Sequence, residues 1–184
     1  MPASSSILEL DGSNLRVEDV VRVARSNPGE ITVRLSEDAR RRTNELRSYL
    51  EANWLTDDAP AMYGINTGLG RLKDSRISAA DLDRFQLLII NSHSSGVGEP
   101  IAEDVARALL VLRVNALSKG ISGLRVECLD RLLEMLNRGV HPVIPVQGSV
   151  GASGDLAPCA HMVSVMIGHP EAEAYFEHER LPAA

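Results

Sequence analysis

The stretch "GSVGASGDLAP", residues 148–158, carries a glycine at every third position and then turns apolar. Its glycines and the two small residues between them are Gly148, Gly151, Ala152, Ser153 and Gly154. Three structures fit such a pattern: a phosphate-binding loop, the tight entry to a helix, and a backbone segment that reacts with itself. The flanking residues distinguish among them.

The two nucleotide-binding alternatives disagree with these flanking residues. A phosphate-binding loop of the P-loop type has a lysine and a hydroxyl residue directly after its last glycine, whereas Asp155 follows Gly154 here. A carboxylate at that place would repel a phosphate. A dinucleotide-binding turn follows a strand, whereas the preceding "HPVIPVQ" contains Pro142 and Pro145, which lack the N–H groups of a central strand. A structural turn and a cyclising backbone remain.

Cyclisation has a chemical basis in these residue types. In a sharp bend, the amide nitrogen of Gly154 attacks the carbonyl carbon of Ala152, and two molecules of water are lost. The product is an imidazolone ring in which the side-chain carbon of Ser153 has become an exocyclic methylidene. Small side chains permit the bend, serine supplies the leaving hydroxyl, and the glycine nitrogen is the least hindered nucleophile. The product is a strong electrophile that requires no metal.

Composition and charge exclude several classes of partner. A chain of 184 residues suits one domain with a sizeable core. It has 19 basic against 25 acidic residues and only 3% aromatic residues, which argues against nucleic-acid binding. No secretory signal is visible at the start, and no apolar stretch approaches the roughly 20 residues that span a bilayer. We therefore expect a cytoplasmic protein with no nucleic-acid or membrane partner.

Apolar periodicity predicts a mainly α fold. The predicted helices cover about residues 17–25, 37–53, 79–92, 103–119, 126–138 and 155–167. Two short extended pieces, "ILEL" and "ITVRL", precede the second of these helices. Residues 56–77 lack regular periodicity and form a long loop, a kind of segment that is usually functional or disordered.

Local signals add detail to the helices. We expect Ser36 to cap the second helix, and Ser78 and Asp81 to form a capping box before the third. One apolar face of the fourth helix carries Val105, Leu109, Leu112 and Ala116, and one face of the fifth carries Val126, Leu129, Leu132, Leu133 and Leu136.

Two sets of residues are expected to carry no chemistry. Cys128 and Cys159 lack metal-ligand spacing and are expected to be reduced, packed thiols. The arginines of the second helix alternate with acidic residues and indicate a solvated face rather than an anion site; they are Arg40, Arg41, Arg42 and Arg47.

Three motifs together carry a family resemblance. The chain resembles the aromatic amino acid ammonia-lyase family in three motifs that occur in the family's order: "YGINTGLG" (63–70), "NSHSSGVGEP" (91–100) and "GSVGASGDLAP". The residue pattern of these motifs is most similar to that of the histidine enzymes of the family. The similarity extends from about Ile7 to the end. It implies a helical ammonia-lyase-like fold of the fumarase/aspartase-type superfamily with a long active-site loop. It also implies a 4-methylideneimidazole-5-one (MIO) group formed from Ala152, Ser153 and Gly154, so cyclisation becomes the favoured alternative.

The resemblance assigns roles to three further residues. Tyr63 corresponds to a tyrosine that transfers protons, His93 to a position beside the substrate side chain, and Gly70 to backbone that lines the substrate site. Without the resemblance, Tyr63 would be taken as a packed ring and His93 as a capping or surface residue. The remaining histidines are expected to be structural or on the surface: His141, His161, His169 and His178. Leu69 and Cys159 replace residues common in the family motifs.

The length of the chain limits what the resemblance implies. Family chains run to several hundred residues, so residues 1–184 are interpreted as an incomplete amino-terminal ammonia-lyase domain. The favoured activity is elimination of ammonia from L-histidine to give urocanate. The alternatives are a tyrosine ammonia-lyase, an aromatic aminomutase, and a non-catalytic truncated subunit. Family members form homotetramers with shared active sites, which implies a homotetramer or a complementing partner chain.

Overall fold

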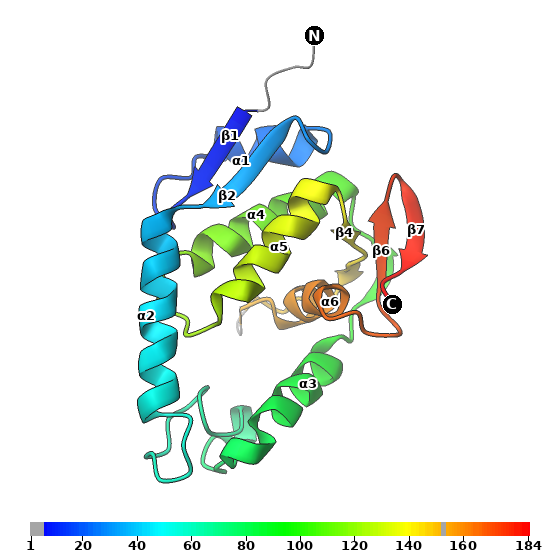
Figure 1. The fold of residues 1–184 in the computed structure, drawn as a ribbon. Helices are drawn as coiled ribbons and strands as arrows, with labels where there is room; N and C mark the ends of the chain where they lie inside the picture. Colours follow the sequence, from blue (N-terminus) through cyan, green and yellow to red (C-terminus); the bar gives the residue numbers. More distant parts are fainter. Residues whose placement is uncertain (1–5, 152–153) are drawn as a thin grey trace.

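The computed structural model describes residues 6–151 and 154–184, and the mainly α prediction is confirmed in this part (Figure 1). Its α-helices are α1 (Val17–Arg25), α2 (Glu37–Asn53), α3 (Leu82–His93), α4 (Glu103–Leu117), α5 (Val126–Arg138) and α6 (Leu156–Met166). Two short 3₁₀ helices, η1 (Gly70–Leu72) and η2 (Ala79–Asp81), interrupt the segment between α2 and α3. No helix in the described ranges has the length and apolar character needed to cross a bilayer.

Short strands form three small sheets in the described part of the chain. The strands are β1 (Ser6–Leu10), β2 (Ile31–Leu35), β3 (Val97–Pro100), β4 (His141–Pro142), β5 (Pro145–Gln147), β6 (Glu173–Phe176) and β7 (Glu179–Pro182). β1 pairs with β2, β3 pairs with β5, and the third sheet has the order β4-β6-β7. Pro142 and Pro145 therefore lie in edge strands, which agrees with their exclusion from a central strand.

The first sheet is parallel, with α1 as the connection between its strands (Figure 1). Side chains of β2 alternate between buried and exposed, so Ile31, Val33 and Leu35 point into the core. On the outer edge of β2, the Asn137 side chain accepts from the Val33 N–H at 2.9 Å and donates to the Val33 carbonyl at 2.8 Å. The sequence predicted both extended pieces, but not their pairing.

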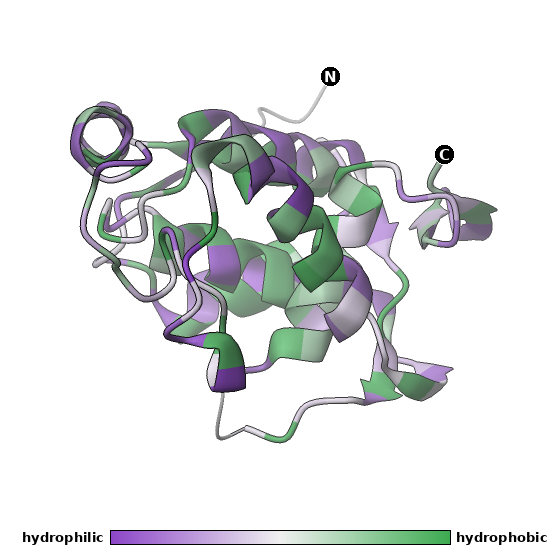
Figure 2. Cartoon of the chain, turned by 90° about the horizontal axis from the view of Figure 1, so that it is seen from below, coloured by the Kyte–Doolittle hydropathy of each residue, from purple (hydrophilic) through white to green (hydrophobic). Residues whose placement is uncertain are grey.

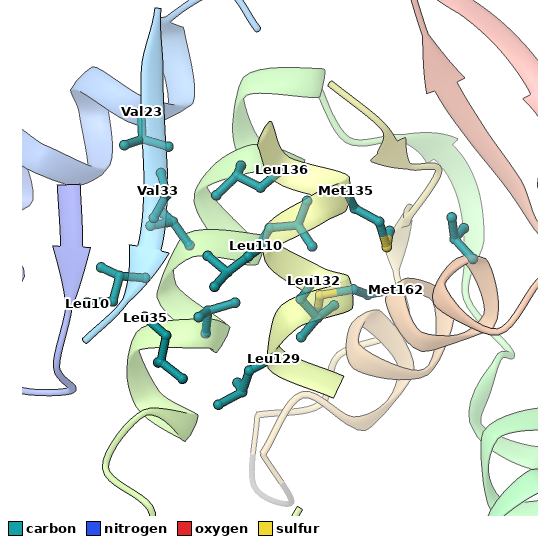
Figure 3. Packing of buried hydrophobic residues seen from close by; sticks show 14 of the residues in the cluster. Leu10, Val23, Val33, Leu35, Leu110, Leu129, Leu132, Met135, Leu136 and Met162 are labelled. Atoms are coloured by element: carbon teal, nitrogen blue, oxygen red, sulfur yellow. The ribbon is translucent and has the colours of Figure 1, made fainter. Parts of the chain in front are cut away.

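The core lies between this sheet and helices α4, α5 and α6. Figure 3 shows side chains from β1, β2 and α1 meeting those of α4 and α5, with Met162 of α6 on the far side. The predicted face of α5 is buried along its whole length. The apolar face predicted on α4 is not the buried one, because Val105 and Leu112 are 46% and 47% exposed while Leu110 and Val114 are fully buried. Since α4 is apolar around most of its circumference, periodicity alone did not select the face.

Helix capping agrees with the prediction at α2 and differs at α3. Ser36 Oγ accepts a hydrogen bond from the Ala39 N–H at 3.1 Å, as expected. The capping box at Ser78 is wrong: its hydroxyl donates to the Asp81 carboxylate at 2.6 Å and caps no backbone N–H. A 3₁₀ turn occupies this place, so α3 begins later, at Leu82.

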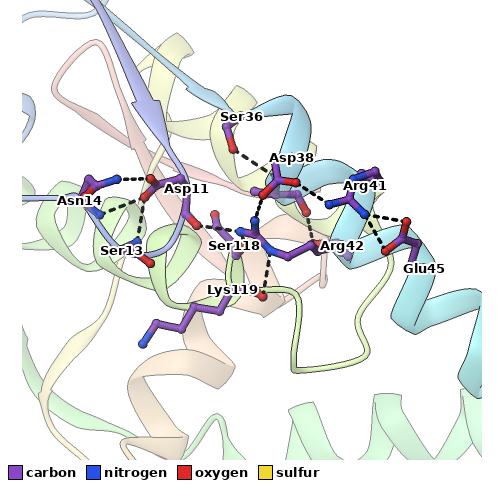
Figure 4. Close-up of polar contacts among 12 residues, drawn as sticks. Asp11, Ser13, Asn14, Ser36, Asp38, Arg41, Arg42, Glu45, Ser118 and Lys119 are labelled. Carbon is purple, nitrogen blue, oxygen red and sulfur yellow. Dashed lines mark hydrogen bonds and ion pairs between the residues drawn. The ribbon is translucent and has the colours of Figure 1, made fainter.

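The four arginines of α2 all form ion pairs with carboxylates of the described chain. Arg40 forms a two-bond ion pair with Asp130 of α5, and Arg41 lies between Asp38 and Glu45. Figure 4 shows that Arg42 also reaches the backbone, since it donates to carbonyls at the end of β1 and at the end of α4. The two cysteines are free and half-buried, as predicted.

A buried polar cluster joins α1, α4, α5 and β4. Arg107 donates to the Val23 carbonyl, to the Leu136 carbonyl, and to Nε2 of His141 at 2.9 Å. Because an arginine can only donate, Nε2 of His141 is the acceptor, and its Nδ1–H donates to Glu103 at 2.9 Å. Burial lowers the pKa of His141 and favours this neutral form.

Helix α3 stands apart from this core. None of its residues is fully buried, and Leu87 and Leu88 are about half exposed. It packs against α6, and the long loop precedes its first residue (Figure 1). Viewed from below, apolar segments gather in the middle of the chain, and hydrophilic ones, α2 among them, lie at its periphery (Figure 2). The second and third motifs meet where α3 contacts α6.

Candidate active site

The glycines of residues 148–158 serve two different purposes. Gly151 and Gly154 have φ angles of +73° and +86°, and an added Cβ at either would meet no atom within 4 Å. These two glycines are needed for the left-handed backbone rather than for space. Gly148 differs, because an added Cβ would lie 3.1 Å from both Ala157 Cβ and Gly96 Cα. It permits a close approach of three segments.

Hydrogen bonds close the glycine stretch on itself. The Gly154 N–H donates to the Gly151 carbonyl at 3.1 Å, and the Gly151 N–H donates to Ser149 Oγ at 3.3 Å. The Ser149 hydroxyl donates to the carboxylate of Asp155, the residue before α6. Asp155 has a φ of +56° and does not cap α6 with its side chain. The carboxylate therefore ties the two ends of the bend together.

The predicted ring residues are only partly within the described structure. Ala152 and Ser153 lie outside the described residues, whereas Gly154 is described. Helix α6 begins two residues after Gly154, so its positive N-terminal end lies beside the stretch. Among residues 6–151 and 154–184, no group of three His, Cys, Asp or Glu side chains is arranged to hold a metal ion.

The second motif packs against the third. β3 lies in the second motif, after His93, and pairs antiparallel with β5. β5 leads directly into the glycine stretch, and Val97 of β3 is opposite Gln147 of β5. The contact between Gly148 and Gly96 continues this pairing. Residues about fifty positions apart in the sequence are thereby held side by side.

His93 is the last residue of α3 and is half-buried. Its Nδ1 lies 2.7 Å from the Ile89 carbonyl and 3.0 Å from Ser92 Oγ. Because a carbonyl only accepts, Nδ1 carries the proton that bonds Ile89. In the neutral imidazole, Nε2 is then an acceptor, and no hydrogen bond within the described chain uses it. This nitrogen is available to a ligand that donates a proton.

The first motif is folded around Asn66, a residue that the sequence analysis did not single out. Its side chain is 1% exposed; Oδ1 accepts from the Met62 N–H at 2.7 Å, and Nδ2 donates to the carbonyls of Trp54 and Pro60 at 3.0 Å each. These three bonds fix the backbone directly before Tyr63. An asparagine between two glycine turns was the available signal, since such a side chain commonly bonds backbone in loops.

Tyr63 and Gly70 remain apart from the other site residues in the described chain. Tyr63 is 63% exposed, and Gly70 opens η1 with a φ of +57°. No hydrogen bond between described residues joins either of them to His93 or Gly154. The loop is attached at the start of α3, where Asp57 accepts from the Ala79 N–H. His93 lies at the opposite end of this 12-residue helix, about 18 Å away along the axis.

The structure therefore joins the second and third motifs and leaves the first one separate. Within the described residues, the loop that carries the first motif is attached before the first residue of α3, and His93 is the last residue of that helix.

Comparisons with known proteins identify a sequence family and close relatives of this chain. Residues 15–184 match the sequence family described as aromatic amino acid lyase. The chain is 46% identical over 172 residues to histidine ammonia-lyase of Alkaliphilus oremlandii and 49% identical over 174 residues to that of Myxococcus xanthus. These alignments cover 94% and 95% of the chain, but only 32% and 33% of the relatives. The chain thus spans about a third of their length.

Solved structures resemble the chain over the same extent. The ergothioneine-degrading enzyme ergothionase from Treponema denticola aligns with a TM-score of 0.88 at 31% identity, over 97% of this chain and 34% of that one. Tyrosine aminomutase from Streptomyces globisporus aligns with a TM-score of 0.83 at 33% identity, over 96% of this chain and 32% of that one.

Proposed function

This chain belongs to the aromatic amino acid lyase family, and on that premise we propose that it is the part of an ammonia-lyase that carries the electrophile and one wall of the substrate site. The favoured reaction is elimination of ammonia from L-histidine to give urocanate. The observation that supports the proposal is the junction of the second and third motifs, where Gly96, three residues after His93, packs against Gly148 at the start of the glycine stretch. The relatives named histidine ammonia-lyase favour the same substrate.

The described residues fit a ring formed from Ala152, Ser153 and Gly154. Gly151, Gly154 and Asp155 all have left-handed backbone, and the space around both glycines is open. The bond from Gly154 N–H to the Gly151 carbonyl would have to be released before that nitrogen attacks the Ala152 carbonyl. Once formed, the MIO group would supply an electrophile for the substrate amine.

Other residues of the chain handle the proton and the side chain of the substrate. Tyr63 is proposed to remove the proton from the β-carbon, once its exposed loop is covered by the rest of the enzyme. Gly70 contributes backbone to the same wall. His93 offers its unprotonated Nε2 to a ring N–H or hydroxyl. Phenylalanine would leave this polar group of the site unpaired. Such a loss disfavours phenylalanine as a substrate by roughly 1–3 kcal/mol. Histidine and tyrosine are therefore expected ahead of phenylalanine.

Two alternatives have specific support. The likeness to tyrosine aminomutase favours a tyrosine ammonia-lyase or an aromatic aminomutase, since His93 also suits a phenol. The separation of Tyr63 from the other motifs favours a subunit that is inactive alone and complements a partner chain. The homotetramer, the assignment of residues 1–184 as one incomplete amino-terminal domain, and the cytoplasmic location stay predictions.

Intact mass spectrometry tests the proposal. We expect the protein to be lighter than its sequence mass by two waters, and Ser153→Ala to abolish this difference without loss of the fold. Urocanate formation from L-histidine, compared with tyrosine and phenylalanine, then identifies the substrate. An unmodified mass in folded, active protein would refute formation of the ring. Gly151 and Gly154 would then serve only to form the turn.

A further inference from the structure

A histidine on α6 binds the turn that follows His93. The His161 imidazole accepts a hydrogen bond at Nε2 from the backbone N–H of Gly96, with 3.0 Å between the nitrogens. Three residues further along α6, Ser164 Oγ lies 3.0 Å from Ser94 Oγ. Because residues three apart share a helix face, one side of α6 holds both ends of the 94–96 turn.

Gly96 has no room for a side chain at this contact. An added Cβ would lie 2.9 Å from His161 Nε2, 3.2 Å from Pro145 Cβ and 3.3 Å from the Gln147 carbonyl oxygen. The lack of a side chain lets the Gly96 backbone come within hydrogen-bond distance of the imidazole.

The turn connects His93 rigidly to the glycine stretch. The Ser95 N–H donates to the His93 carbonyl at 2.8 Å, so only a tight turn separates His93 from Gly96. Gly96 in turn touches Gly148, where the glycine stretch begins. Helix α6, which carries His161, starts where the same stretch ends.

From these contacts we propose that His161 is a positioning residue, which fixes His93 relative to the glycine stretch by holding the 94–96 turn against α6. The consequence for catalysis rests on the proposed function, because it requires His93 to bind substrate. The hold on the turn itself does not depend on that function.

The contact requires one protonation state of the imidazole. Nε2 accepts from an N–H only when it carries no proton, so the proton of the neutral ring is on Nδ1. Burial lowers the pKa of His161, which favours this form. His161 also lines a cavity of about 520 Å³ with polar groups from α3, the 169–171 turn, β6 and β7; they are Asn91, His169, Glu171, Glu173 and Arg180. Arg180 is paired with Glu173.

Two substitutions separate the acceptor from the bulk of the side chain. In His161→Gln, the amide oxygen lies close to the place of Nε2 and does not titrate. In His161→Asn, the amide is too short to reach Gly96. His169→Asn is the matched control, because His169 lines the same cavity and bonds its own turn at Glu171 instead.

The first readout is hydrogen exchange of the backbone amides of residues 94–98. It is measured in the complete protein from pH 5 to 8 and expressed as protection factors. His161→Asn should lower protection about fivefold to tenfold, the effect of one lost hydrogen bond. His161→Gln and His169→Asn should match the original protein at pH 8. Protection in the original protein should fall at low pH, whereas protection in His161→Gln should not. Equal protection in the Asn and Gln variants would overturn the proposal.

Kinetics with L-histidine provide the second readout. We expect His161→Asn to raise KM about tenfold with a smaller change in kcat, because ground-state contact with His93 is weakened, and His161→Gln to restore KM. A normal KM in His161→Asn would overturn the role in positioning His93. If exchange behaves as expected while the original protein releases no ammonia from any aromatic amino acid, the proposed function is refuted and the hold of His161 on the turn is supported.

Discussion

Replacing Asn66 by aspartate is expected to open the loop of residues 56–77 while the helical body stays folded. The substitution keeps the shape of the side chain and the oxygen that accepts from the Met62 N–H. It replaces the NH₂ group that donates to the carbonyls of Trp54 and Pro60 with a second oxygen. An aspartate would therefore place an ionised oxygen against two carbonyl oxygens in a site that is 1% exposed.

The size of the effect follows from the two lost donations. A buried polar group left without its partner costs roughly 1–3 kcal/mol, so two such losses predict a decrease of about 2–6 kcal/mol in the free energy of opening the loop. Hydrogen exchange of the loop amides should then accelerate by about 30-fold or more, since exchange reports the opening equilibrium. Amides of α4 and α5 should keep their rates, because the loop contributes nothing to the core between them.

The assay is hydrogen exchange followed by mass spectrometry of peptides from the loop and from the body. Asn137→Asp is the matched control: Asn137 is also an asparagine that bonds backbone on both sides, but its partner is Val33 in β2. That variant should destabilise the body and spare the loop. If Asn66→Asp exchanged like the original protein throughout residues 56–77, the three bonds would not be what holds the first motif.

The remaining predictions concern proton transfer and pH. Tyr63→Phe should lower turnover of L-histidine by about 100-fold or more while the loss of two waters persists, because only the proton acceptor is removed. Steady-state kinetics and intact mass spectrometry check this. Near-normal turnover would exclude the acid–base role of Tyr63. The pKa of His141 lies below its ordinary value of 6.5 in the folded protein, so the unfolded chain binds more protons near that pH and the free energy of unfolding should fall as the pH drops from 7 to 5. Chemical denaturation at several pH values should show that the free energy of unfolding depends less steeply on pH in His141→Gln. His178→Gln, which removes a 90% exposed partner of the same Glu103, should keep the slope.

The sequence predicted those features that depend on neighbouring residues. The bounds of α2, its Ser36 cap and the buried face of α5 follow from local pattern, because each involves residues within a few turns of one helix. The pairing of β1 with β2 required knowledge of contacts between distant residues. The buried face of α4 was also beyond local pattern, since apolar residues follow one another without a break at Leu110, Val111 and Leu112, and such a run fits either face.

The candidate site shows the same limit. Motifs predicted roles for Tyr63, His93 and Gly154, but they did not predict that His161 accepts a hydrogen bond from the Gly96 N–H in the turn that follows His93. That contact joins residues 65 positions apart and depends on a glycine that makes room for a backbone N–H. The burial of Asn66 was not predicted either, because a polar residue in a polar loop is expected at the surface. The neighbouring glycine turns indicated only that its side chain bonds backbone.

The placement of prolines in the small sheets bears on how this protein avoids association through its backbone. Both strands of the β3–β5 pair contain a proline, and so do β4 and β7, the two outer strands of the third sheet. An edge strand recruits a strand from another molecule through its unpaired N–H groups, and a proline removes one of them. These two sheets therefore end in edges that are poor templates for amyloid-like growth.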